Sequence, residues 1–159
     1  MLAVLSRLGG DRFAIETRHI VEIIPMVKAR QLGPVQPWLL GLFNHRGRLL
    51  PLVDTGIILS RGPIPIRMHS RIIVCRVAVE ATSDAGPHHV GLLVEELLGV
   101  DRLKIAPDGL HPGLTSIDGV GLGSLMVTNR GELQLIDPSR LFSLEQRSLL
   151  FQESLETIP

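Results

Sequence analysis

Short runs of aliphatic residues, separated by glycine, proline and charged residues, recur along the whole chain of 159 residues. Runs that are only a few residues long and bounded by turn formers are typical of strands in all-β barrels and sandwiches. We therefore predict an all-β fold. The predicted strands are Leu2–Leu8, Arg12–Thr17, Leu40–Asn44, Arg48–Val53, Arg71–Val79, Val90–Glu95, Leu103–Ile105, Gly123–Val127 and Glu132–Ile136.

Helical signals are few. The stretch Arg18–Ile24 predicts a short helix that ends before Pro25, because proline disfavours helical geometry in the preceding residue. Ser143 with Gln146 three residues later forms a capping-box pattern. This pattern predicts a C-terminal helix over residues 143–159, whose apolar side either covers the barrel or stays exposed for a partner.

A faint internal repeat divides the chain. Residues Asn44–Asp54 and Asn129–Asp137 both read as an Arg-Gly turn that leads into an aliphatic strand ending in Asp. Two similar units predict two small barrels rather than one large sheet. We place them at approximately 12–70 and 71–142, and residues 1–8 form a strand whose barrel the pattern does not decide.

The composition narrows the class of protein. With 45% apolar residues, a chain of this length can bury a sizeable core. The single cysteine, Cys75, excludes an internal disulfide and a cysteine-based zinc site, and we expect it to be buried. The first residues do not resemble a signal peptide, and no uncharged apolar run reaches the ~18 residues of a membrane helix. We therefore expect a soluble cytoplasmic protein.

The formal net charge is zero, because sixteen Lys and Arg balance sixteen Asp and Glu. This balance argues against bulk nucleic acid or an anionic membrane as the main partner. It also conceals an asymmetry. Residues 1–79 hold eleven basic and four acidic side chains, a formal +7, whereas residues 80–159 hold five and twelve, a formal −7. We predict that the two barrels differ in surface potential, each suited to its own partner.

Signatures of catalysis and of cofactor binding are absent from the sequence. The glycines of Gly119–Gly123 fit a crowded strand or bulge better than a phosphate loop. His88 and His89 are adjacent, so on a strand they point to opposite faces and cannot easily share a metal ion. Asp54 and Asp137 each end a strand, where Asp commonly caps the following turn. We expect no enzyme activity, no cofactor and no metal.

The most informative string is Pro37–Asp54, in which Gly41 interrupts an apolar run and Arg46 stands at the tip of a turn. Together with two segments upstream, this string resembles the CheW family, the adaptor proteins of bacterial chemosensory arrays. The upstream segments are Phe13–Glu16 and Ile20–Pro25. The resemblance continues through Val90–Glu95, Gly121–Gly123, Leu135–Asp137 and Leu141-Phe142.

This resemblance implies a single CheW-like domain over residues 1–159, built from two five-stranded SH3-like barrels. It also implies a non-catalytic adaptor that couples a chemoreceptor (a methyl-accepting chemotaxis protein) to a histidine kinase of the CheA type. The expected partners are the receptor's cytoplasmic hairpin tip and the kinase's regulatory domain. The expected location is the cytoplasm, at membrane-associated receptor arrays, with neither nucleic-acid binding nor direct membrane insertion.

The resemblance also assigns receptor-binding residues. They are Ile20, Ile23, Gly41, Asn44 and Arg46. Ile20 and Ile23 would share one face of the short helix, although core packing is an equal alternative for both. Gly41 would permit another backbone to approach closely. Glu22 matches an acidic position that pairs with the turn arginine, which predicts a Glu22–Arg46 salt bridge rather than a solvated turn.

The kinase contacts match less specifically. They fall on Val90, Gly91 and Leu92, and core packing is a competing explanation for Leu92. Three features depart from the family pattern: Arg48 is basic where a smaller or apolar side chain is usual, Thr55-Gly56 replaces an arginine, and the loop Ser60–Met68 is rich in Pro and Arg. These departures favour a dedicated receptor from a surface-sensing or pilus-control system over a standard flagellar one.

Two other functions stay open at this stage. A nucleic-acid-binding barrel could use the basic half of the chain, and its affinity would then fall steeply with salt. An enzyme could use a groove between the barrels, around Asp54 and His45. Convergent titratable groups in that groove would be its signature.

Overall fold

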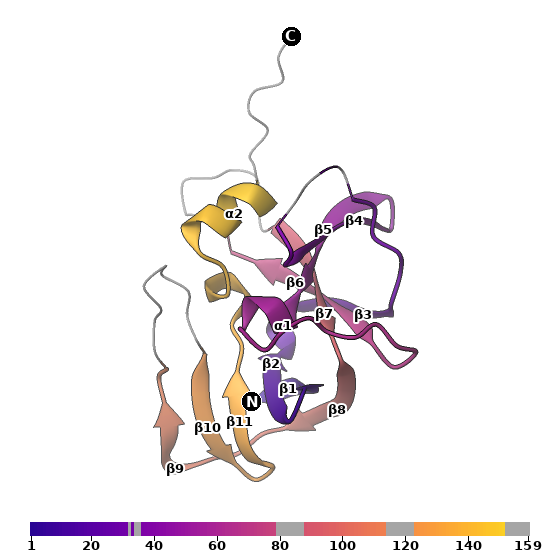
Figure 1. The fold of residues 1–159 in the computed structure, drawn as a ribbon. Helices are drawn as coiled ribbons and strands as arrows, with labels where there is room; N and C mark the ends of the chain where they lie inside the picture. Colours follow the sequence, from indigo (N-terminus) through magenta and orange to yellow (C-terminus); the bar gives the residue numbers. More distant parts are fainter. Residues whose placement is uncertain (32, 34–35, 79–87, 114–122, 152–159) are drawn as a thin grey trace.

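The computed structural model describes residues 1–31, 33, 36–78, 88–113 and 123–151, which fold into two β-sheets (Figure 1). The six-stranded sheet has the order β8-β1-β2-β11-β10-β9, and the five-stranded sheet has the order β3-β6-β7-β5-β4. The strands of the first are β1 (Leu2–Leu8), β2 (Asp11–Glu16), β8 (Glu96–Arg102), β9 (Ile105–His111), β10 (Ser124–Thr128) and β11 (Gly131–Leu135). The strands of the second are β3 (Ile20–Pro25), β4 (Leu39–His45), β5 (Arg48–Asp54), β6 (Arg71–Val77) and β7 (His88–Val94). The all-β prediction is confirmed.

The repeat detected in the sequence has a counterpart in the topology. Its two copies form the hairpins β4–β5 and β10–β11. Each hairpin belongs to a unit of five strands, and its second strand runs parallel to a strand from elsewhere in the chain. Strand β5 pairs in this way with β7, and β11 pairs with β2. Five strands of the larger sheet, β8-β1-β2-β11-β10, therefore repeat the order of the smaller one, and β9 is additional.

The predicted boundaries at 12–70 and 71–142 do not coincide with the sheets. Strands β6 and β7, between residues 71 and 94, complete the unit that β3 to β5 begin. Residues 2–16, which include the strand left unassigned, instead complete the unit of β8 to β11. Parallel pairing causes this difference, because it joins strands that are distant in sequence and leaves no local pattern.

The predicted helix at Arg18–Ile24 is wrong. Only Thr17–His19 are helical, as a single 3-10 turn named η1, and Ile20–Pro25 form the edge strand β3. This segment is rich in β-branched residues, which favour strands, and β6 offers it a pairing edge. Strand β8 was also missed, because Gly99 interrupts its apolar pattern.

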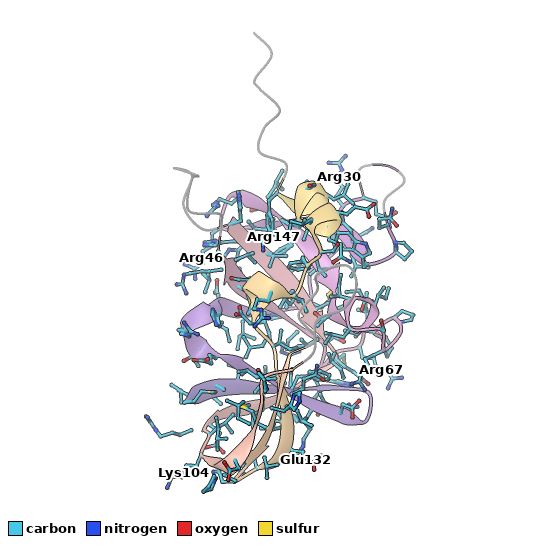
Figure 2. The ribbon with its side chains drawn as sticks, turned by 90° about the vertical axis from the view of Figure 1, so that its left-hand side faces the viewer. Arg30, Arg46, Arg67, Lys104, Glu132 and Arg147 are labelled. Carbon is cyan, nitrogen blue, oxygen red and sulfur yellow. The ribbon has the colours of Figure 1, made fainter. Side chains whose placement is uncertain are left out.

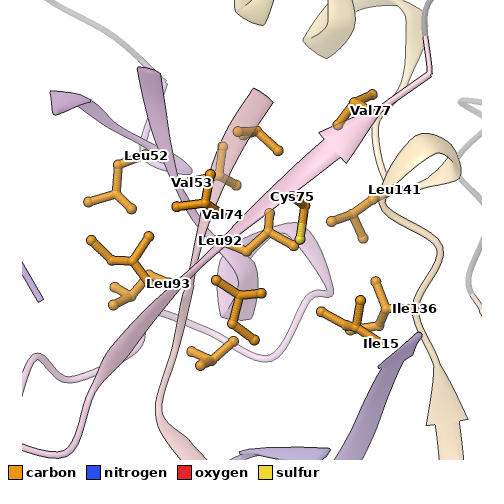
Figure 3. Packing of buried hydrophobic residues seen from close by; sticks show 14 of the residues in the cluster. Ile15, Leu52, Val53, Val74, Cys75, Val77, Leu92, Leu93, Ile136 and Leu141 are labelled. Carbon is orange, nitrogen blue, oxygen red and sulfur yellow. The ribbon is translucent and has the colours of Figure 1, made fainter. Parts of the chain in front are cut away.

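Strands β1 and β2 join the two sheets by alternating their side chains between two cores. One set of residues lies in the smaller cluster within the six-stranded sheet, namely Ala3, Leu5 and Ala14. The other set enters the larger cluster, shared with β5, β6 and β7, namely Val4, Leu8, Phe13 and Ile15. Figure 3 shows Ile15 beside Ile136, in the same buried cluster as Cys75 and Leu92 of the five-stranded sheet. The shared core explains why two small units form one domain.

The helices are short and begin with the expected caps. Asp54 caps α1 (Thr55–Ile58), and Asp137 caps the 3-10 turn η2 (Pro138–Arg140). The Ser143–Gln146 capping box starts α2 (Leu144–Leu150), and residues 152–159 of the longer predicted helix lie outside the described residues. Within the described part of the chain, no helix is both long and apolar enough to span a membrane.

Helix α2 is held against the five-stranded sheet. Arg147 donates to the carbonyl oxygens of Ser139 at 2.7 Å and Ala78 at 2.8 Å. The ring of Phe151 stacks on that of His88 with 4.6 Å between their centroids. Leu150 and Phe151 therefore pack against the core, whereas Leu144 and Leu149 are exposed, so the apolar side of the helix covers the barrel only at its end.

Candidate functional site

The two edge strands of the five-stranded sheet meet through one carboxylate. Glu22 of β3 accepts hydrogen bonds from Arg46 at 3.0 and 3.1 Å, through two nitrogens of the guanidinium group. His45 donates to the same carboxylate from Nε2 at 2.6 Å. Because β3 and β4 are opposite edges of this sheet, these bonds close it into a barrel. The predicted Glu22–Arg46 salt bridge is confirmed, and His45 is an additional member that the sequence did not indicate.

The turn that carries Arg46 is a tight two-residue hairpin. Arg46 and Gly47 both have positive φ, 53° and 84°, as the commonest two-residue β-hairpin turn requires. Asn44 Oδ1 accepts a hydrogen bond from the Gly47 amide at 2.8 Å. Asn44 therefore stabilises the turn, which fixes the direction in which Arg46 leaves the barrel.

The contacts within this site favour the charged forms of Glu22 and Arg46. Hydrogen bonds from Arg46, and then from His45, lower the pKa of Glu22 to about 2. The same carboxylate raises the pKa of Arg46. The side chain of Arg46 is nevertheless 76% exposed (Figure 2). The arrangement therefore presents a permanently charged guanidinium group in a fixed position at the surface.

Gly41 lies in β4 at a bulge and has a φ of 132°. A Cβ atom there would stand 2.4 Å from the carbonyl oxygen of Arg30, so only glycine fits. Arg30 also exchanges two backbone hydrogen bonds with Leu42, at 2.7 and 2.9 Å. The predicted close approach of a backbone at Gly41 does occur, but the approaching backbone is this chain's own segment.

Ile20 and Ile23 lie on β3 and not on a helix face. They pair with Cys75 and Ile73 of β6, and a bulge falls between Ile20 and Glu22. Both isoleucines are half-buried and pack against the larger core. Core packing and partial exposure therefore coexist at these two positions, next to the Glu22 carboxylate.

The three residues predicted to bind a kinase are inside the molecule. Val90 and Leu92 have exposed fractions of 0% and lie on the central strand β7. A Cβ atom at Gly91 would stand 2.5 Å from the Phe43 ring, so this glycine makes room for core packing. A partner cannot reach these positions directly, and the prediction needs correction because β7 is covered on both faces.

The groups of the proposed enzyme site do not converge. His45 precedes β5 and bonds to Glu22, whereas Asp54 ends β5. Asp54 is buried and accepts hydrogen bonds from the amides of Ile57 and Ile64, both at 3.1 Å. Among the described residues, no group of three His, Cys, Asp or Glu side chains is arranged to hold a metal ion.

Comparison with known proteins identifies the family. The CheW-like domain family matches residues 2–146. The chain belongs to this family.

Two curated relatives are similar to this chain in sequence, and one solved structure is similar in fold. Protein PilI of Pseudomonas aeruginosa is 30% identical over 99 residues, which cover 62% of this chain and 51% of PilI. Protein FrzA of Myxococcus xanthus is 26% identical over 108 residues, which cover 68% of this chain and 62% of FrzA. The chain thus spans little more than half the length of the curated relatives it matches. The fold resembles the scaffolding protein TtCheW of Thermoanaerobacter tengcongensis, with a TM-score of 0.71 at 18% identity, covering 91% of this chain and 94% of TtCheW.

This CheW-like domain also has an apolar groove that the sequence did not reveal. The segment after β3, the start of β4 and the loop residue Ile66 line a shallow, open groove of about 670 Å³. Its apolar lining is Met26, Val27, Ala29, Leu40 and Ile66, and the cations Lys28 and Arg30 lie beside it. The sequence signal was slight: Ile66 is an apolar residue between Pro65 and Arg67, in a loop rich in proline and arginine.

Proposed function

We propose that this CheW-like protein is a non-catalytic adaptor that couples a chemoreceptor to a CheA-type histidine kinase. It would bind the hairpin tip of the receptor and the regulatory domain of the kinase, in the cytoplasm at membrane-associated arrays. Membership of the CheW-like family and the fold shared with the scaffolding protein TtCheW support this proposal. The single observation that carries it is the exposed Arg46 held in place by Glu22.

The hydrogen bonds that hold Arg46 make it suited to bind the receptor. An exposed arginine normally loses side-chain freedom when a partner immobilises it, and that loss weakens binding. Glu22 has already ordered this guanidinium group with two hydrogen bonds, so a partner can use its exposed edge at lower entropic cost. The half-buried Ile20 and Ile23 supply apolar area on the neighbouring strand. A polar anchor beside a small apolar strip suits one face of an amphipathic helix.

The kinase side requires a second surface, because an adaptor must hold both partners at once. We assign it to the apolar groove around Ile66, since Val90, Gly91 and Leu92 are buried. Leu40 of this groove and Arg46 lie at opposite ends of β4, which at ~3.4 Å per residue separates them by roughly 20 Å. The groove therefore leaves the surface of Arg46 free for the receptor.

Reconstitution with a chemoreceptor hairpin fragment and a CheA-type kinase regulatory domain from the same organism tests the proposal. Arg46→Glu should abolish binding of the receptor hairpin fragment and leave kinase binding intact. Ile66→Asp should do the reverse, and its matched control is Met68→Asp, an exposed residue outside the groove lining. Failure of the wild-type protein to bind either partner would overturn the function.

A further inference from the structure

One end of the barrel formed by β3 to β7 carries a group of charged and histidine side chains, which we call the mouth cluster. It consists of Glu22, His45, Arg48, Arg76 and His89. His45 faces Arg48 across the β4–β5 hairpin, and Arg76 faces His89 across β6 and β7. Arg48 donates from Nη1 to His89 Nδ1 at 3.3 Å. All five strands of the barrel thus bring these side chains to the same end as Arg46.

The charges of the mouth cluster do not balance. Its one carboxylate, Glu22, already bonds to Arg46 and His45. None of the ion pairs among the described residues includes Arg48 or Arg76. Arg76 instead donates from Nη1 to the main-chain oxygens of Arg18 at 3.1 Å and Ile20 at 3.2 Å.

The positive charges of the mouth cluster act on the pKa of His89. Burial lowers the pKa of His89, and the nearby charges of Arg48 and Arg76 lower it further. The other titratable groups that act on it are His45 and His88, in the same direction. The lowered pKa favours the neutral imidazole, whose Nδ1 can accept the hydrogen bond from Arg48.

Some other arginines in the chain form ion pairs with a carboxylate. Arg7 pairs with Glu95 and Glu96, Arg61 with Asp11, and Arg130 with Asp101. The last pair lies at the position in the second unit that corresponds to Arg46 and Glu22, at the hairpin turn opposite an edge strand. Arg48 and Arg76 are two of several exposed arginines outside these pairs, and their place at the end of the barrel that carries Arg46 distinguishes them from the rest.

We propose that the mouth cluster binds carboxylates from an acidic face of the helix that docks at Arg46. The identity of that helix as a receptor rests on the proposed function, whereas the preference for an acidic helix rests on the cluster. A guanidinium group binds a carboxylate through two parallel charge-assisted hydrogen bonds, which add specificity as well as affinity. Arg48 and Arg76, which flank His89, would therefore select partners that carry Glu or Asp at matching positions.

Binding of the receptor hairpin fragment at several salt concentrations tests the cluster. The double variant R48Q/R76Q should bind about tenfold more weakly or worse at low salt, with a shallower dependence on salt. Arg102→Gln is the matched control, because Arg102 is an exposed arginine on β8 of the other unit. A receptor fragment with its surface Glu and Asp replaced by Gln and Asn should bind wild type and the double variant equally. Unchanged affinity and salt dependence in R48Q/R76Q would overturn the proposal.

A second probe separates this inference from the proposed function. A helical peptide of about 20 residues, with Glu at every third or fourth position, should shift the NMR signals of the His89 ring and the Arg48 side chain. If the receptor fragment does not bind wild type but the peptide does, the adaptor function fails and the acidic-helix site stands. If the peptide leaves these signals unchanged, or duplex DNA binds through the same arginines as tightly, the acidic-helix site is overturned.

Discussion

Arg46 and Glu22 lie 24 residues apart on opposite edges of one sheet, joined by two hydrogen bonds of 3.0 and 3.1 Å. Together with the bond from His45 to the same carboxylate, this contact closes the barrel, and it fixes an exposed charge at the surface. A structural feature and a proposed recognition feature therefore depend on the same carboxylate.

Exchanging the two charges tests whether this geometry matters for binding. Arg46→Glu alone should reduce receptor affinity at least tenfold, because it removes the anchor and places two carboxylates together. The double exchange E22R/R46E should recover the barrel closure, measured as the thermal midpoint, but not the receptor affinity. If the double exchange restored receptor affinity, the receptor would require only a closed barrel and not a cation at position 46.

The pKa of Glu22 predicts how stability depends on pH. A carboxylate whose folded pKa is about 2, below its ordinary value of 4.5, stabilises the fold above the ordinary value. That contribution is lost as the pH falls from about 4.5 towards 2. The free energies of unfolding of wild type and Glu22→Gln should therefore differ most above pH 5 and converge near pH 2. A constant difference across this range would contradict the assigned ion pair.

Gly41 should tolerate no side chain. Gly41→Ala forces a Cβ against the Arg30 carbonyl oxygen at 2.4 Å and a positive φ, which should cost about 1–3 kcal/mol in urea denaturation. Gly33→Ala separates the two causes, because Gly33 has a similar φ of 123° but open space around it. Equal losses in the two variants would mean that the contact with Arg30 has no importance.

Some of this site could be predicted from the sequence, because its information is local. An Asn, an Arg and a Gly within four residues specify a turn with one exposed cation, and the family resemblance supplied its partner Glu22. His45 gave no signal, since a contact over 23 residues depends on how the sheet curves. Ile20–Pro25 was misassigned because a short aliphatic run fits a helix and a strand equally well until a pairing strand is known. The boundaries between the two units could not be predicted, because parallel pairing joins strands that are distant in the sequence.

Leu92 should affect stability rather than recognition. It is completely buried, so Leu92→Ala should destabilise the fold by about 2–5 kcal/mol. Kinase affinity, measured well below the unfolding midpoint, should stay within twofold of wild type. A large loss of affinity in a variant shown to be folded would restore this region as a kinase contact.

The most direct test of the account is assembly of the ternary complex, measured by size-exclusion chromatography with light scattering. We predict one complex that contains the receptor fragment, the adaptor and the kinase regulatory domain. Arg46→Glu should leave only the adaptor–kinase complex, and Ile66→Asp only the adaptor–receptor complex. Loss of both partners from either folded variant, or of neither, would contradict two separate binding surfaces on one CheW-like domain.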